Sequence, residues 1–144
     1  MRAVLDTASV VAAVRSDAGA SRRLLRAALE RRRGFTLLVS VPLLIEYEAV
    51  LTRTEHLKAA GLSVADVGVL LDAIAAVSEP VHLAYLWRPT LRDANDDMVL
   101  ETAINGAADV IVTFNRRDFI AVAKQFELSI LSPGDALTRL ERTS

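Results

Sequence analysis

The sequence predicts a three-layer α/β/α domain in which helices cover both faces of a parallel sheet of about five strands. Short apolar runs alternate along the chain with longer segments of helical character, which is the order that parallel sheets require. Apolar residues make up 52% of the sequence, as expected for strands that are buried on both faces. The length of 144 residues suits one domain with a substantial core, so we expect residues 1–144 to form a single unit.

Five short apolar runs predict the strands of this sheet. The first run stops at Asp6, and the fourth leads into Asn115, so polar residues stand where strands end. The expected strands, in chain order, are 2–5, 36–40, 80–87, 109–113 and 128–131.

The segments between the strands carry helix signals. Gly34 follows the first helical segment, as glycine often follows a helix end. Pro42 stands at an early helical position, and Ser63 with Asp66 has the spacing of a capping box. Ser132 begins the last helix with a similar spacing. The expected helices cover about 9–33 with a break near 17–19, then 42–53, 63–78, 96–106 after a turn at 92–95, 119–126, and the stretch from 132 onward.

The composition excludes several classes of site. The chain contains no cysteine, which removes disulfides, thiolate zinc sites and cysteine nucleophiles. No apolar run reaches the ~18 residues that would suggest a membrane span. The opening "MRAVLDTASVV" contains Arg2 and Asp6 and makes a poor signal peptide. We therefore expect a soluble, cytoplasmic protein that does not associate with membranes.

Arginines are clustered locally, although the formal net charge is only -1. The segment "SRRLLRAALERRR" at 21–33 is strongly basic. Arg22, Arg26 and Arg33 fall within roughly 40° of one another on a helical wheel at ~100° per residue. Such a patch is either a solvated helix face or a surface that contacts phosphate groups, and the sequence leaves both interpretations open.

Acidic residues follow the predicted strands at the points where the strands end. In open parallel sheets, sites form beyond the carboxyl ends of the strands, so these acids should meet at one edge. For Asp93, Asp96 and Asp118, taken singly, capping of a helix start is the favoured interpretation. Asp6 differs because it directly follows an apolar strand and nothing near it in sequence can pair with it. The candidates are Asp6, then Glu46 and Glu48, then Asp93, Asp96 and Asp97, and finally Thr113, Asn115 and Asp118.

Carboxylates gathered in one place repel one another unless a cation neutralises them, which predicts a divalent metal ion. His56 lies in a polar connection and His82 in a predicted strand, and we interpret both as structural. A site made of oxygen ligands favours Mg²⁺ or Mn²⁺ over Zn²⁺. Such an ion binds phosphate oxygens and lowers the pKa of a bound water, which is the arrangement for hydrolysing a phosphodiester.

Helical periodicity narrows the ligand set in part. On the helix over 96–106, Asp97 lies at the edge of the apolar stripe with Glu101 one turn later, so Asp97 can face a cleft beside the core. On the helix over 42–53, Glu46 and Glu48 flank the stripe on opposite sides at similar angles. Periodicity does not choose between these two glutamates.

Three segments resemble the PIN-domain proteins, and especially the bacterial PIN-type toxins related to VapC. "VLDTASVV" is similar to the opening strand motif, whose usual form is D-T-N, and "SVPLLIEYEAVLTR" is similar to the helix with the second acid. "LRDANDDMVLETAINGAADVIVTFNRRDF" is similar to the later acidic motifs in succession. The resemblance covers nearly the whole chain and implies a Rossmann-like fold and a metal-dependent ribonuclease.

The resemblance also implies roles for individual residues. Asp6, Glu46 and Asp97 match the acids that hold Mg²⁺ or Mn²⁺, and Asp118 matches a further catalytic acid. The expected supporting residues are Asp93, Thr113 and Asn115. The place of the arginines in the sequence, and not the resemblance, makes Arg116, Arg117, Arg22 and Arg26 the expected RNA contacts, and simple surface charge stays open as the alternative for them. Ala8 replaces the usual Asn, and Asn115 is neutral where an acid is common, so catalysis by one metal ion or by two stays open.

Proteins of this kind are toxin components, which implies a small antitoxin protein as partner, RNA as substrate and a homodimer. The alternative is a catalytically weak PIN fold that binds RNA or a protein, and Ala8 and Asn115 support it. A phosphoacceptor receiver domain would need a lysine after the fifth strand, where Ser132 and Pro133 stand. A haloacid-dehalogenase-type phosphatase would need an aspartate in place of Ala8.

Overall fold

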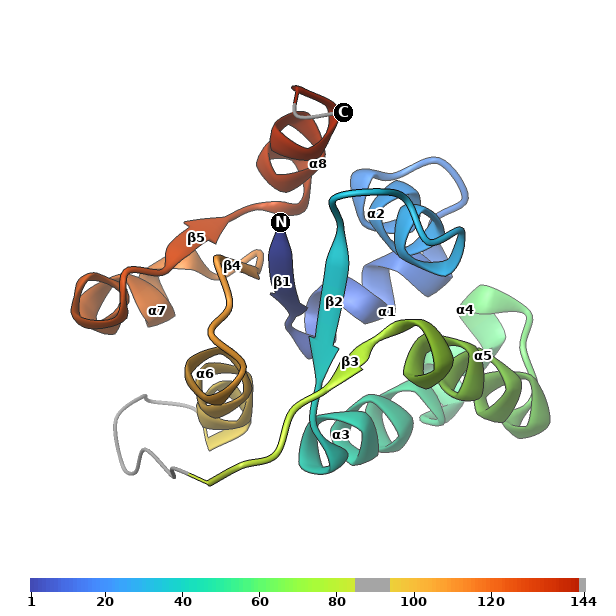
Figure 1. The fold of residues 1–144 in the computed structure, drawn as a ribbon. Helices are drawn as coiled ribbons and strands as arrows, with labels where there is room; N and C mark the ends of the chain where they lie inside the picture. The colour runs from blue at the N-terminus through green and yellow to red at the C-terminus, as the bar shows by residue number, and fades with distance from the viewer. Residues whose placement is uncertain (85–93, 143–144) are drawn as a thin grey trace.

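The computed structural model of the chain describes residues 1–84 and 94–142. These residues form a five-stranded parallel sheet with the strand order β3-β2-β1-β4-β5 (Figure 1). The strands are β1 (Arg2–Leu5), β2 (Thr36–Val39), β3 (Glu79–Pro80), β4 (Val110–Val112) and β5 (Ser129–Leu131). The predicted parallel α/β architecture is therefore confirmed.

The helices lie on both faces of the sheet because the strand order reverses once. The chain steps from β1 to β2 to β3, and right-handed crossovers place the intervening helices on one face. It then returns to the other side of β1, which puts α6 and α7 on the opposite face (Figure 1). The helices are α1 (Thr7–Arg15), α2 (Ala20–Leu29), α3 (Val41–Leu51), α4 (Thr54–Ala60), α5 (Val64–Val77), α6 (Ala94–Asn105), α7 (Arg116–Ala123), a 3₁₀ turn η1 (Lys124–Phe126) and α8 (Pro133–Arg142).

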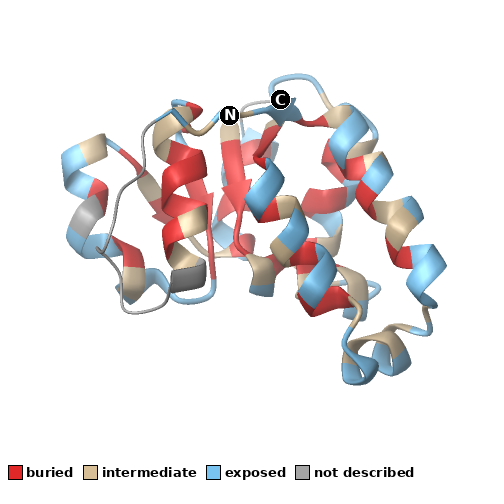
Figure 2. Cartoon of the chain, turned by 90° about the horizontal axis from the view of Figure 1, so that it is seen from below, coloured by how far each residue is buried: buried red, intermediate tan, exposed pale blue. Residues whose placement is uncertain are grey.

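The core is densest around the two central strands. Val4 and all of β4 are fully buried, as expected of strands covered by helices on both faces. Figure 2 shows buried residues on the strands and on the inward sides of the helices, with exposed residues facing outward. The helix starts follow their sequence signals, since Ser63 and Asp66 form the predicted capping box and Ser40 caps α3 ahead of Pro42.

Two elements differ from the sequence prediction. The strand expected over 80–87 is wrong for 81–84, because β3 ends at Pro80; residues 85–87 lie outside the described residues. Both β3 residues are exposed at the sheet edge, where short strands and proline are usual. His82 is likewise exposed in the irregular segment. The polar connection expected around 54–60 is instead the short helix α4, which packs against α1 and α3.

Within the described ranges, no single helix is long and apolar enough to cross a membrane. The helices α4 and α5 are long and apolar enough only when they are taken together, and the chain bends by 82° between them.

A β-carbon at Gly106 is expected to destabilise the fold. It would lie 2.8 Å from Val81 Cγ2 and 2.9 Å from Leu38 Cδ1, so Gly106→Ala forces the end of α6 away from the sheet. Overpacking of this kind costs about 1–3 kcal/mol.

In α5, Gly68 has open space around its β-carbon position, so Gly68→Ala should be stabilising by about 0.5–1 kcal/mol. Urea unfolding of both variants measures the two changes, and equal stability of Gly106→Ala and the wild type would contradict this packing.

Candidate active site

The carboxyl ends of β1 and β4 mark the point at which the strand order reverses. Leu5 pairs with Val112, so Asp6 and Thr113 leave the two strands side by side. The chain then runs into α1 from β1 and toward α7 from β4, on opposite faces of the sheet. A crevice opens between connections that diverge in this way. A cleft of about 310 Å³ lies at this point.

The Asp6 carboxylate is buried and is held by two hydrogen bonds. One oxygen, Oδ1, accepts from the Ser9 backbone N–H at 2.8 Å, which makes Asp6 the N-cap of α1. The other, Oδ2, accepts from the Thr113 hydroxyl at 2.5 Å. Only 5% of Asp6 is exposed, and a carboxylate so placed needs such donors. Asp6 is therefore both a helix cap and a charge fixed at the end of β1.

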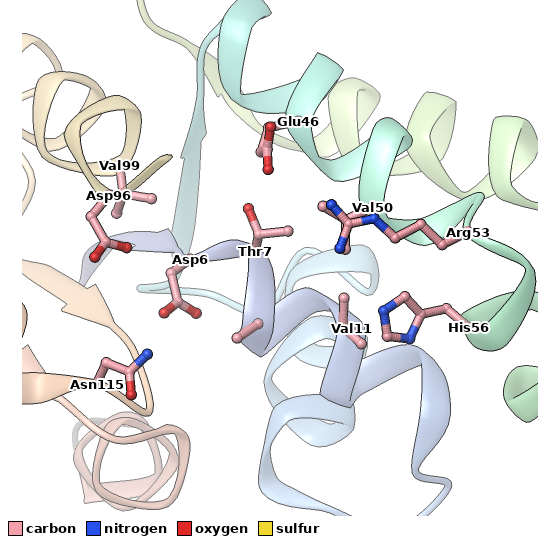
Figure 3. A pocket seen from close by; sticks show the side chains of 11 residues that line it. Asp6, Thr7, Val11, Glu46, Val50, Arg53, His56, Asp96, Val99 and Asn115 are labelled. Atoms are coloured by element: carbon pink, nitrogen blue, oxygen red, sulfur yellow. The ribbon is translucent and has the colours of Figure 1, made fainter. Parts of the chain in front are cut away.

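Thr113 extends this set of bonds to the loop after β4. Its hydroxyl oxygen accepts from the Asn115 backbone N–H at 2.9 Å, and the Thr113 side chain is fully buried. The Ser9 hydroxyl donates to the Val112 carbonyl at 3.2 Å. These bonds join the start of α1 to the end of β4 and leave the Asn115 side chain on the cleft (Figure 3).

The position of α3 is set by hydroxyl groups at its start. Ser40 Oγ accepts from the Leu43 backbone N–H at 3.3 Å and lies 2.8 Å from Thr102 Oγ1 on α6. Since the Thr102 hydroxyl donates to the Met98 carbonyl at 2.8 Å, Ser40 is the donor in the bond between the two side chains. This bond connects α3 to α6, the two helices that bring further acids to the cleft.

Tyr47 fixes α3 against the end of β1. Its hydroxyl donates to the Leu5 carbonyl at 2.5 Å, next to Asp6 in the chain. Burial raises the pKa of Tyr47 far above its ordinary value, and the nearby Asp6 charge raises it further, so the phenol stays protonated as a donor. Glu46 is half-buried and lines the cleft, whereas Glu48 is exposed and is not among the lining residues. The tertiary structure thus separates the two glutamates that periodicity left equivalent.

On α6, the acid on the cleft wall is Asp96 and not Asp97. Asp96 is half-buried and lines the cleft, while Asp97 and Glu101 are buried, with exposures of 7% and 1%, and are not among the lining residues. Consecutive helical residues point ~100° apart, so a shift of one position selects another direction. The expectation that Asp97 faces the cleft therefore differs from the structure. Asp93 lies outside the described residues.

The cleft has an acidic end and a basic end (Figure 3). Asp6, Asp96 and Asn115 approach one another on one side, and Glu46 projects from α3. Arg53 and His56 line the same cleft farther along α3 and α4. Arg53 was not among the expected site residues, and His56 was expected to be structural. The helix expected over 42–53 contains a usable signal, because Glu46, Val50 and Arg53 stand at i, i+4 and i+7 on it, although Arg53 in the structure follows α3 as the N-cap of α4.

The acidic end offers only oxygen donors, from carboxylates and one amide. No group of three acidic or histidine side chains within residues 1–84 and 94–142 is close enough to hold one ion alone. The types of donor fit Mg²⁺, which takes one or two carboxylates directly and keeps several waters.

Arg22 and Arg26 lie away from this cleft. The Arg22 guanidinium donates to the carbonyls of Ala13 and Val14, the latter at 3.0 Å, and so satisfies the C-terminal end of α1. Arg22 and Arg26 line a separate hollow of about 320 Å³ that also contains Asp66. Of the four arginines that were expected to contact RNA, Arg22 and Arg26 thus line this second hollow and not the acidic cleft.

The three residues of the "RRDF" segment that were expected to act in the site, Arg116, Arg117 and Asp118, lie in the first turn of α7. Arg116 Nε donates to the Ile130 carbonyl at 3.2 Å, and Arg117 is exposed. Asp118 is half-buried, and its backbone N–H donates to the Asn115 carbonyl at 3.1 Å. None of Arg116, Arg117 and Asp118 is among the residues that line the acidic cleft.

Comparisons with known proteins agree with this fold. The chain is similar to the crystal structure of VapBC2 from Rickettsia felis bound to a DNA fragment from the VapBC2 promoter, with a TM-score of 0.61 and 17% sequence identity. The similarity covers 92% of this chain and 98% of that chain, and at this identity it concerns the fold. A comparison with proteins of curated function finds no match. Residues 2–117 match the model of the PIN domain. Because this match spans most of the sequence, the chain belongs to the PIN domain family, whose members are generally nucleases.

Proposed function

We propose that this protein is a Mg²⁺- or Mn²⁺-dependent endoribonuclease and the toxin component of a toxin–antitoxin pair. The observation that carries the proposal is the convergence of Asp6, Glu46, Asp96 and Asn115 on one cleft from four separate segments. Such a set of acids at the strand-order reversal suits a divalent cation that binds phosphate.

The proposed ligands are Asp6, Glu46 and Asp96, with Asn115 as a neutral oxygen donor. When bound, the ion supplies positive charge for the scissile phosphate and lowers the pKa of the attacking water. Asp6 has little freedom to move, because the Ser9 N–H and the Thr113 hydroxyl hold both of its oxygens. This orientation before substrate binds reduces the reorganisation needed during the reaction. Glu46 and Asp96 are more exposed and can accept protons from water.

Removing either of two acids is expected to abolish metal-dependent cleavage. Asp6→Asn and Glu46→Gln keep the side-chain shape and remove the charge, so turnover of single-stranded RNA should fall about a hundredfold or more. Glu48→Gln, on the same helix as Glu46 but away from the cleft, is the matched control and should cleave like the wild type. Cleavage assays with Mg²⁺, Mn²⁺ or EDTA, with calorimetric titration of Mn²⁺, measure these effects.

Two results would contradict the proposal. Cleavage by Asp6→Asn at the wild-type rate would remove Asp6 from the mechanism. Retention of RNA by the wild type without metal-dependent products would favour the catalytically weak binding module, which Ala8 and Asn115 support.

Asp96 and Asp97 provide a direct test of the third ligand. Asp96→Asn should reduce Mn²⁺ affinity and cleavage, because Asp96 lines the cleft. Asp97→Asn should change Mn²⁺ affinity little, because the Asp97 side chain is buried and is not among the residues that line the cleft. Thermal unfolding followed by circular dichroism separates loss of the fold from loss of the site. The reverse pattern, in well-folded variants, would return the ligand role to Asp97.

The proposed partners are a small antitoxin that covers the cleft and a second copy of the chain in a homodimer. The similar Rickettsia felis structure is a VapBC2 complex, which supports a partner of this kind. Expression of the protein should arrest bacterial growth, and co-expression of the neighbouring reading frame should relieve the arrest. Continued arrest would remove the antitoxin from the proposal, and a monomer mass by light scattering would remove the homodimer.

A further inference from the structure

An arginine and a histidine line the same cleft as the proposed metal ligands. Arg53 follows the end of α3 and caps the start of α4, and His56 lies in the first turn of α4. Figure 3 shows both side chains on the side of the cleft away from Asp96 and Asn115. The cleft therefore changes from negative to positive along its length.

The Arg53 guanidinium is available to a ligand. Arg53 is exposed, and within residues 1–84 and 94–142 the ion pairs join other residues and leave Arg53 out. Other arginines are engaged by the protein itself: Arg2 pairs with Glu79, Arg22 satisfies carbonyls of α1, and Arg116 binds the carbonyl of Ile130. Arg53 thus combines a place on the cleft wall with donors that the described part of the chain does not use.

The His56 ring is oriented by a neighbouring arginine. Arg15 Nη1 lies 3.4 Å from His56 Nδ1. An arginine can only donate, so this contact requires Nδ1 to accept and places the ring hydrogen on Nε2 in the neutral imidazole. His56 is half-buried and lines the cleft. Its Nε2–H is therefore a donor beside Arg53, supported from behind by the charge of Arg15.

An RNA strand needs positive charge beside this acidic site. A divalent ion held by Asp6, Glu46 and Asp96 would offset only part of their negative charge, so the phosphate next to the scissile one would still be repelled by the remainder. We propose that Arg53 and His56 form a subsite for the phosphate adjacent to the scissile one. They act as positioning residues that direct single-stranded RNA along the cleft from the acids toward α4. This subsite rests on the proposed nuclease function.

Removal of the Arg53 charge should weaken RNA binding in the absence of cleavage. In EDTA, Arg53→Gln is expected to bind a fluorescein-labelled oligouridine RNA about threefold to tenfold more weakly, with a salt slope smaller by about 0.7, the value for one phosphate contact to a single strand. Arg53→Lys should regain most of the affinity because it keeps the charge. Fluorescence anisotropy over a salt series measures both quantities. Arg139→Gln, which removes the same charge from an exposed residue on α8, is the matched control.

The two positions also predict a kinetic pattern. With Mg²⁺, Arg53→Gln should raise KM and leave kcat nearly unchanged, because a phosphate contact away from the reacting bond is shared by the bound substrate and the transition state. His56→Leu should weaken binding, whereas His56→Gln, which keeps an N–H donor on its amide, should retain it. A purely structural role of α4 would not reproduce this dependence on charge and donor.

The outcomes separate the subsite from the nuclease. Unchanged affinity and salt slope in Arg53→Gln, an equal loss in Arg139→Gln, or no RNA binding by the wild type would overturn the subsite. If Arg53→Gln fails to fold by circular dichroism, the comparison of His56→Leu with His56→Gln decides instead. RNA binding that depends on Arg53 but yields no metal-dependent cleavage would end the nuclease proposal and leave a phosphate-binding cleft. Metal-dependent cleavage whose KM does not change in Arg53→Gln would end the subsite proposal and leave the nuclease proposal in place.

Discussion

The bond between the Thr113 hydroxyl and the Asp6 carboxylate is the constraint on which the site depends. It joins the carboxyl ends of β1 and β4, the two strands between which the strand order reverses. A buried carboxylate without donors would be strongly destabilising, and the Ser9 N–H and the Thr113 hydroxyl occupy both of its oxygens. The same two donors belong to the start of α1 and to the end of β4. The energetic requirement of one buried charge thus determines where both connections leave the sheet.

Hydroxyl groups at the edge of the sheet extend this constraint to the other acids. Tyr47 ties α3 to the Leu5 carbonyl, and the Ser40–Thr102 bond ties α3 to α6. Glu46 and Asp96 therefore belong to helices that are fixed against β1 and against each other. A site built in this way can tolerate mutual repulsion among its carboxylates, since the packing of the helices and not the acids themselves holds them in place. Arg53, at the start of α4, then gives the cleft its change of sign.

Structural and functional interpretations of an acid need not exclude each other in this fold. Asp6 caps α1 and also faces the cleft, so a helix-start signal did not make it a poor candidate. Asp97 and Glu101 show the opposite case, in which acids within the "NDDMVLE" run are buried and do not line the cleft. Among neighbouring acids, the direction of the side chain separates the two cases more surely than the residue type does.

The sequence by itself determined the alternation of strands and helices, the parallel sheet, the capping box of Ser63 and Asp66 and the place of Asp6, because these follow from local patterns and from the rule that sites lie at strand ends. Only the tertiary structure shows that Asp96 and Glu46 line the cleft and that Asp97 and Glu48 are not among its lining residues, since the rotation of a helix about its axis depends on packing against distant segments. It also decided the short β3 and the helix α4, where no buried apolar stripe marks the element in the sequence. The place of Arg53 and His56 on the cleft has the same cause. The helix α4 is positioned by contacts with α1, which lies far from it in the chain, and with α3, from which it is separated by a short turn.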